Sequence, residues 1–142
     1  MTVSIEASAL RPPAPASTTA ERATSSVLQD LLTDGVLPAA CPSRIVLDHV
    51  TSKWGVLVLV ALSEGTRRWG ELRRVVEGIS EKMLASTLRT LEADGLVLRE
   101  ATPSIPPRVD YSLTPLGREL ATHLLPLVSW VAAHAEAIVR RG

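Results

Sequence analysis

The chain has 142 residues, 46% of them apolar, so it can close one hydrophobic core and is expected to form one domain with extensions. Its 15 Lys and Arg balance its 15 Asp and Glu, so the overall charge indicates neither a nucleic-acid partner nor a membrane partner. A single cysteine, Cys41, excludes an intrachain disulfide framework and a multi-cysteine zinc site, and this cysteine usage is typical of a reducing cytoplasm.

The first forty residues predict a tail and a short leader helix. Residues 1–22 are rich in Pro, Ala, Ser and Thr without periodicity, and we expect a flexible N-terminal tail there. They lack a basic start followed by an apolar run, so we expect no secretory signal there. Residues 23–40 are expected to hold a helix from Ser25 to Leu32, ended by Asp34-Gly35, and a linker. The domain proper is therefore expected at residues 41–142.

Four helices are predicted next, at residues 42–50, 53–62, 70–76 and 81–93. The second is apolar nearly all round, which indicates a central, buried helix. Its apolar run, residues 54–62, is far too short to cross a bilayer, so we expect no membrane partner and a cytoplasmic protein. Gly78 breaks the chain after the third helix, and Ser80 is the expected N-cap of the fourth.

A hairpin and a long helix complete the predicted order. Leu96 to Glu100 and Arg108 to Leu113 read as two antiparallel strands, and the second places Val109, Tyr111 and Leu113 inward by alternation. The loop between them, residues 101–107, has three prolines and should project as a stiff finger. Thr114 caps a final helix that runs to about Val139, with Pro126 as a kink or break inside it.

This order predicts a mainly α-helical fold with a small β-hairpin (α+β), namely a winged helix-turn-helix with added terminal helices. On the helix at residues 81–93, Leu84, Leu88 and Leu91 share one face, while Lys82, Ser86, Arg89 and Thr90 cluster opposite. A helix anchored by its apolar face can enter the major groove, where Arg pairs with guanine acceptors. Residues 44–118 also carry eleven basic against nine acidic side chains, a mild excess of two positive charges.

Three groups of residues are therefore candidates for contact with double-stranded DNA. The recognition-helix candidates are Ser80, Lys82, Met83, Ser86, Thr87, Arg89 and Thr90. The wing candidates are Arg99, Ser104, Pro106 and Arg108. The candidates for contacts with the DNA backbone are Lys53, Arg67, Arg68, Arg73 and Arg74. Two alternatives stay open at this point: the charges only solvate a helix surface, or the same hairpin and helix form a protein-interaction module without specific DNA binding.

The chain resembles the HxlR-type family of bacterial winged helix-turn-helix transcription regulators, which are related to the MarR group. The resemblance runs from Cys41 to about Trp130. It rests on Cys41-Pro42, Lys53-Trp54, Arg68-Trp69-Gly70-Glu71-Leu72, Ile79-Ser80, Met83-Leu84, Leu88-Arg89, Leu91-Glu92, Asp94-Gly95-Leu96, Pro106-Pro107-Arg108-Val109-Asp110-Tyr111 and Leu113-Thr114 with Gly117. Trp69 stands where a Phe is commoner in the family, and Thr102 stands where an aromatic residue is often found in the wing.

The resemblance implies a homodimer that binds a palindromic operator, with residues 81–93 as recognition helix and residues 101–107 as wing. It implies that the terminal helices make the dimer contact. In this chain those are residues 43–50 and 114–139, where Leu124, Leu127, Val128, Val131 and Ile138 offer apolar surface. A repressor that occupies a promoter is the expected role, and its release by a small-molecule effector or by thiol chemistry is left open.

The remaining single residues give weaker signals. Some relatives sense oxidants through a cysteine at the position of Cys41, but a small buried residue that packs under the first helix is the favoured interpretation. His123 and His134 share a helix face but are about 16 Å apart by helical rise, so they cannot hold one metal ion. His49 reads as a packed or surface histidine, and Trp54 and Trp130 as core or dimer contacts. No nucleophile with a base, carboxylate pair or phosphate loop is recognisable, so we expect no enzyme activity, metal or cofactor.

Overall fold

In the computed structural model, residues 22, 26–30, 32 and 39–141 are described. The chain separates into two compact units, residues 1–39 and residues 40–142. Within the first unit, residues 22, 26–30 and 32 are helical and exposed; the tail expected over residues 1–22 lies almost wholly outside the described residues.

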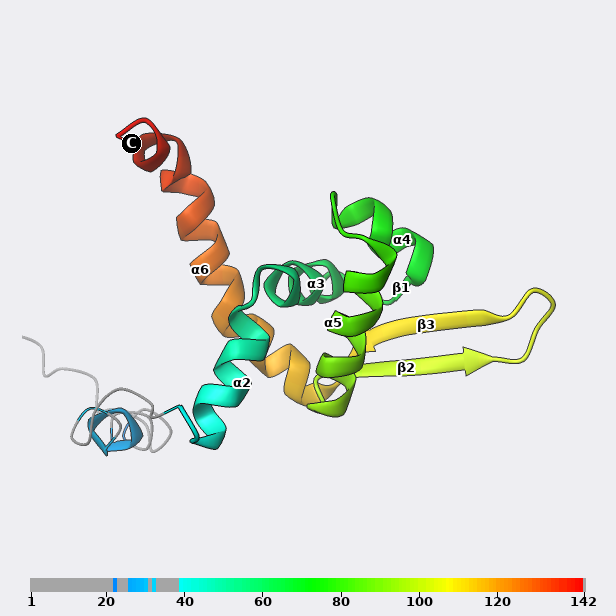
Figure 1. Cartoon of the computed structure of the whole chain (residues 1–142), viewed down its shortest axis with the longest axis horizontal. Helices are drawn as coiled ribbons and strands as arrows, with labels where there is room; N and C mark the ends of the chain where they lie inside the picture. The colour runs from blue at the N-terminus through cyan, green and yellow to red at the C-terminus, as the bar shows by residue number, and fades with distance from the viewer. Residues whose placement is uncertain (1–21, 23–25, 31, 33–38, 142) are drawn as a thin grey trace, which may run out of the picture. The chain divides into compact units, whose positions relative to one another are not determined.

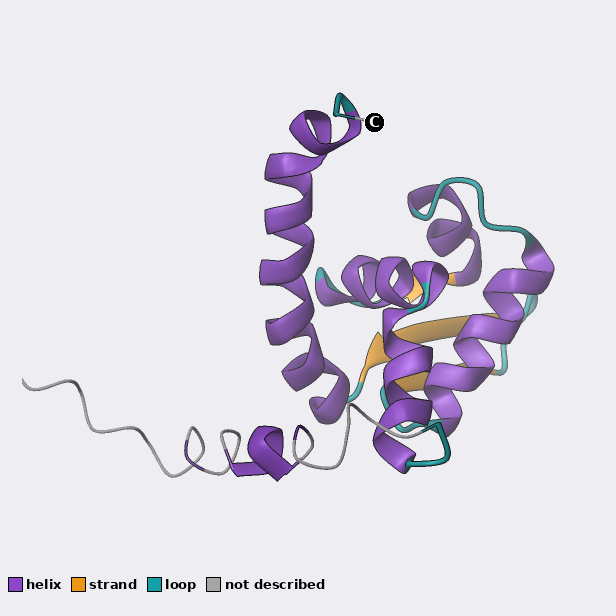
Figure 2. Cartoon of the chain, turned by 60° about the vertical axis from the view of Figure 1, so that its left-hand side comes forward, coloured by secondary structure: helices purple, strands orange, loops and turns teal. Residues whose placement is uncertain are grey.

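The second unit has the element order of a winged helix-turn-helix (Figures 1 and 2). The elements are α2 (Pro42–Thr51), α3 (Lys53–Ser63), β1 (Arg67–Arg68), α4 (Trp69–Val75), α5 (Glu81–Ala93), β2 (Val97–Thr102), β3 (Arg108–Leu113) and α6 (Pro115–Val139). The predicted fold class is therefore confirmed, and every predicted element of this unit is present within about two residues of its expected bounds.

Helix α3 lies at the centre of the unit, as its apolar composition predicted. It contacts α2, α4, α5, α6 and β3. The Ser52 hydroxyl caps its first turn by accepting a hydrogen bond from the Gly55 N–H. Gly55 is needed there because a Cβ would lie 2.4 Å from the carbonyl oxygen of His49, so α2 and α3 approach closely at this corner. The buried residues of α3 are Gly55, Val58, Leu59, Ala61 and Leu62.

A three-stranded antiparallel sheet of order β1-β3-β2 flanks the helices. β3 pairs with β2 along its whole length, from Val97 opposite Leu113 to Thr102 opposite Arg108. Its inward side chains are as predicted, since Tyr111 and Leu113 are buried and Val109 packs against the core. The strand β1 was not predicted. It is a two-residue pairing of Arg67 and Arg68 with β3, too short to show an alternating pattern in the sequence.

Helix α6 is fastened to the rest of the unit at its first turn. Thr114 caps it by accepting from the Gly117 N–H, and a Cβ on Gly117 would lie 2.1 Å from the carbonyl oxygen of Leu96. Gly117, Ala121 and Leu124 are buried, and α6 contacts α3. The expectation that Leu124 offers surface for a partner is therefore wrong: it is only 6% exposed, because it repeats the Gly117–Ala121 face that packs on the core.

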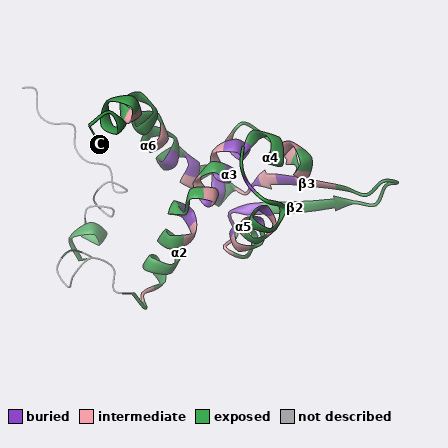
Figure 3. Cartoon of the chain, turned by 45° about the horizontal axis from the view of Figure 1, so that its top comes forward, coloured by how far each residue is buried: buried purple, intermediate pink, exposed green. Residues whose placement is uncertain are grey.

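Beyond Leu124 helix α6 is mostly exposed, as Figure 3 shows. It continues through Pro126 without a break, since a proline removes one N–H and leaves the remaining ladder in place. By length and mean hydropathy (1.2) α6 would also qualify as a membrane-spanning helix. However, its first part is packed on α3, and residues 125–139 alone are about 22 Å long, less than the roughly 30 Å of a hydrocarbon core.

Candidate nucleic-acid interface

Helix α5 is anchored by three leucines and fixed at its start by a cap. Leu84, Leu88 and Leu91 are 0%, 2% and 1% exposed, as the helical spacing predicted. The Ser80 hydroxyl accepts a hydrogen bond of 3.1 Å from the Met83 N–H, so the N-terminal turn is satisfied without a tertiary partner. Burial of these leucines holds the helix firmly enough for its other face to act as a rigid surface.

The opposite face of α5 is open to solvent. Lys82, Ser86 and Arg89 are exposed, and among the described residues neither Lys82 nor Arg89 has a carboxylate partner. Thr87 and Thr90 are only half-exposed, because they line a recess between α5 and α2 together with Asp48, His49 and Ser52. The outward ridge of α5 is therefore narrower than the helical wheel predicted, and it carries two cations, Lys82 and Arg89, on either side of Ser86.

The β2–β3 hairpin projects away from the helices as a finger (Figures 1 and 3). Arg99, Ser104 and Pro106 are all exposed along it, and the Ser104 hydroxyl donates a hydrogen bond of 2.7 Å to the Pro106 carbonyl. Ile105, at the tip, is fully exposed. This isoleucine was not among the sequence candidates, although an apolar residue between Ser104 and two prolines in a projecting loop was a signal that could have identified it.

The Asp110 carboxylate lies beside two arginines, one of which, Arg108, directly follows the β2–β3 loop. The Asp110 oxygens lie 3.1 and 3.2 Å from the Arg108 Nε, and the Arg68 Nε is 4.0 Å from the same carboxylate. The β1–β3 pairing places Arg68 opposite Asp110, which explains the convergence. Arg68 and Arg108 are about half-exposed, so both guanidinium groups remain accessible to an anion in solution.

The other candidates for contact with the DNA backbone differ in how accessible their charged groups are. The Arg67 guanidinium donates to the Ala61 carbonyl and to Glu64, and only 19% of its side chain is exposed. The Arg73 guanidinium is 3.0 Å from the Glu81 carboxylate, which is itself in the first turn of α5. Lys53 Nζ lies 4.2 Å from the centre of the Trp54 ring. Arg74 is exposed, and no partner is recorded for it within the described part of the chain.

Cys41 is the N-cap of α2, and its Sγ lies 3.4 Å from the Arg44 N–H. The thiol is half-buried rather than enclosed under the helix. His49 contacts Asp94 at 2.8 Å, and the His134 ring stacks on Trp130, which is exposed, at 4.4 Å between ring centres. Within the described ranges, no group of three or more His, Cys, Asp or Glu side chains is placed to hold a metal ion.

Comparison with known proteins places these features among bacterial regulators. The HxlR-like helix-turn-helix model matches residues 49–139. The uncharacterised HTH-type transcriptional regulator YtfH of Escherichia coli (strain K12) is 52% identical over 106 residues, which are 75% of this chain and 84% of that protein. The solved structure of ytfH from Salmonella typhimurium is similar with a TM-score of 0.71 and 47% identity, covering 75% of this chain and 96% of that one.

A second similar structure is that of the redox regulator HypR in its oxidised form. It is 39% identical with a TM-score of 0.61, and the match covers 66% of this chain and 96% of HypR. The reduced form of HypR is similar as well, with a TM-score of 0.64. The resemblance therefore extends over the winged unit and most of α6, and it includes the helix whose outer face is cationic.

Proposed function

Because this chain belongs to the HxlR-like helix-turn-helix family and is a transcriptional regulator of the helix-turn-helix type, we propose that it binds a palindromic operator as a homodimer and represses transcription by occupying a promoter. The observation that carries this proposal is the outer face of α5, where Lys82 and Arg89 lie exposed without carboxylate partners among the described residues. A cationic ridge on a helix anchored from behind suits insertion into the major groove.

The contacts divide by the chemistry that each position offers. Arg89, in the C-terminal half of α5, is suited to pair with guanine acceptors, and Ser86 and Lys82 are suited to base edges or phosphates. Ser80, Met83, Thr87 and Thr90 border this ridge and complete the proposed recognition surface.

The wing and the arginines beside α4 are assigned to the DNA backbone. Arg99 and Arg108 lie on the two strands of the wing, with Ser104 and Pro106 in its loop. Arg68, Arg73, Arg74 and Lys53 are assigned to flanking phosphates. We expect Arg67 to contribute less to phosphate binding, because its guanidinium already donates hydrogen bonds to the Ala61 carbonyl and to Glu64.

We propose that the second protomer packs against apolar side chains that are exposed on α2 and α6. These include Ile45 and Leu47 on α2 and Leu127, Trp130, Val131 and Ile138 on α6. Exposed apolar residues on two adjoining helices are characteristic of a subunit interface. The dimer should place its two recognition helices one turn of DNA apart, near 34 Å, and so it implies a palindromic operator. The protein then acts in the cytoplasm, on the nucleoid.

We propose that a small molecule, or chemical modification of the Cys41 thiol, releases the protein from the operator. Two structures similar to this chain are of a protein named as a redox regulator. Cys41 caps α2, one of the two helices of the proposed dimer face, and its thiol is partly accessible. Modification of the thiol would disturb the first turn of α2 and, through it, the dimer.

Selection of binding sites from random duplex DNA tests the proposal most directly. The expected result is an enriched sequence with two-fold symmetry, and sedimentation of the purified protein as a dimer. A gel shift with the enriched duplex and with a scrambled duplex then measures specificity. A protein that sediments as a dimer but enriches no sequence and retards neither duplex at physiological salt would be an interaction module, and the proposal would be wrong.

A further inference from the structure

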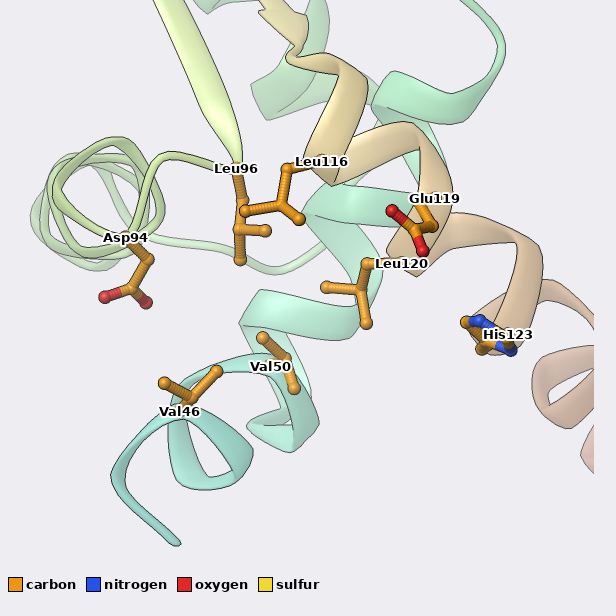
Figure 4. A pocket seen from close by; sticks show the side chains of 8 residues that line it. All are labelled: Val46, Val50, Asp94, Leu96, Leu116, Glu119, Leu120 and His123. Carbon is orange, nitrogen blue, oxygen red and sulfur yellow. The ribbon is translucent and has the colours of Figure 1, made fainter. Parts of the chain in front are cut away.

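We propose that a groove between α2 and α6 binds a small apolar organic cation, and that this ligand is the effector that changes operator affinity. The walls of the groove come from α2, from α6 and from the turn between α5 and β2 (Figure 4). Binding of the cation in the groove does not require that the protein bind DNA. The effect of the cation on operator affinity rests on the function proposed above.

The groove has the size and lining of a small-molecule site. Its volume is about 390 Å³, within the roughly 300–1,000 Å³ that such sites occupy. The aliphatic side chains that line it are Val46, Val50, Leu96, Leu116 and Leu120. They come from three separate elements, so the apolar floor is a product of the tertiary fold and not of one amphipathic helix.

The polar groups of the groove select the charge of the ligand. In Figure 4 the aliphatic side chains lie between Asp94 on one side and Glu119 and His123 on the other. Among the residues that the structure describes, neither Lys nor Arg lines the groove. Glu119 is exposed and has no ion-pair partner among the described residues, so its charge is available. Two carboxylates beside an apolar floor favour a hydrophobic cation and repel an anion of the same shape.

Asp94 connects this groove to the recognition helix. It is the C-cap residue of α5, and its carboxylate lies 2.8 Å from the Nδ1 of His49, in the last turn of α2. His49 lines the recess on the outer side of α5 and not the groove itself. A cation in the groove would compete with His49 for Asp94 and loosen the contact between α2 and the end of α5. The groove is therefore placed to alter the spacing of the two recognition helices.

Titration calorimetry of the full-length protein with tetraphenylphosphonium tests the site. Tetraphenylborate is the matched probe, because it has the same shape and the opposite charge. We expect tetraphenylphosphonium to bind at least about tenfold more tightly than tetraphenylborate. Equal binding of the two ions, or binding of neither, would overturn the proposal. If neither ion binds and the protein sediments as a dimer, the groove would instead be part of the contact with the second protomer.

Two variants locate the bound ion. Glu119→Gln removes a carboxylate from an exposed helix position, so it should leave the fold intact and weaken tetraphenylphosphonium binding by at least about threefold. Glu136→Gln is the control, since Glu136 is an exposed carboxylate on the distal part of α6 and pairs with Arg140. The Glu136→Gln variant should bind tetraphenylphosphonium with the affinity of the parent protein. An unchanged affinity in Glu119→Gln would place the ion elsewhere and overturn the proposal.

Fluorescence anisotropy with a labelled operator tests the regulatory step separately. Saturating tetraphenylphosphonium should change operator affinity, and operator DNA should change the affinity for the ion by the same factor. If the ion binds and operator affinity is unchanged, the groove is a binding site but the effector role is wrong. If operator DNA is bound and the ion is not, this inference fails alone; if the ion is bound and no DNA is, the proposed function fails.

Discussion

Arg108 offers the sharpest test of the wing. The residue begins β3 directly after the β2–β3 loop, and its guanidinium is about half-exposed beside Asp110. In the proposed complex it neutralises a phosphate and carries no base preference. Arg108→Ala should therefore weaken binding to the operator and to unrelated duplexes alike, and it should make binding less sensitive to salt.

The size of the effect follows from counterion release. One lost phosphate contact changes the slope of log affinity against log salt by about 0.9, so the dimer loses about two in slope. Between about 50 and about 200 mM salt this difference corresponds to roughly a tenfold change in affinity, which anisotropy titrations resolve easily. The substitution also leaves Asp110 without its nearest cation, so part of the loss could come from an uncovered carboxylate.

The double variant Arg108→Ala/Asp110→Asn separates these two causes. If Arg108 contacts phosphate, the double variant keeps the flattened salt dependence of Arg108→Ala. If Arg108 only neutralises Asp110, the double variant returns to the slope of the parent. Arg141→Ala is the control, since Arg141 is exposed just beyond the end of α6, and the C-terminal end of α6 lies far from the β2–β3 hairpin in Figure 1. A parental slope in Arg108→Ala itself would refute the assignment of this arginine to the DNA backbone.

Three further predictions concern α5 and α2. Arg89→Ala should reduce discrimination between the operator and versions changed at one base pair by about 1–3 kcal/mol; a competition assay that shows parental discrimination would remove Arg89 from base recognition. Leu88→Ala should lower the free energy of unfolding in urea by about 2–5 kcal/mol, whereas the exposed Ser86→Ala should change it by less than about 0.5 kcal/mol. Native protein should react with iodoacetamide at Cys41; labelling only after denaturation would end the sensor hypothesis.

The sequence predicted those parts of the fold that repeat a pattern over several residues. The leucine spacing of α5, its Ser80 cap and the alternation of β3 all determined the observed elements, because each depends on local geometry. The strand β1 could not be found in this way. It consists of Arg67 and Arg68, and only their pairing with β3 makes it a strand.

Side-chain partnerships were equally hidden in the sequence. Nothing local distinguishes Arg67, whose guanidinium is bound within the chain, from Arg74, which is exposed. The helical wheel of α5 placed Thr90 on the outward face, but α2 packs beside it and leaves it half-exposed. Contacts between elements far apart in the chain decide these cases, and they also bring Asp94 and Glu119 to one groove.

The tight contact between Gly117 and the Leu96 carbonyl has a mechanical consequence. It fixes the base of α6 to the start of the wing, and Ala121 and Leu124 extend the packed part of the helix as far as residue 124. The exposed remainder of α6 is roughly 22 Å long. A rotation of α6 by only about 5° would therefore move its far end by about 2 Å. A second protomer bound at that end would move with it, and the spacing of the two recognition helices would change.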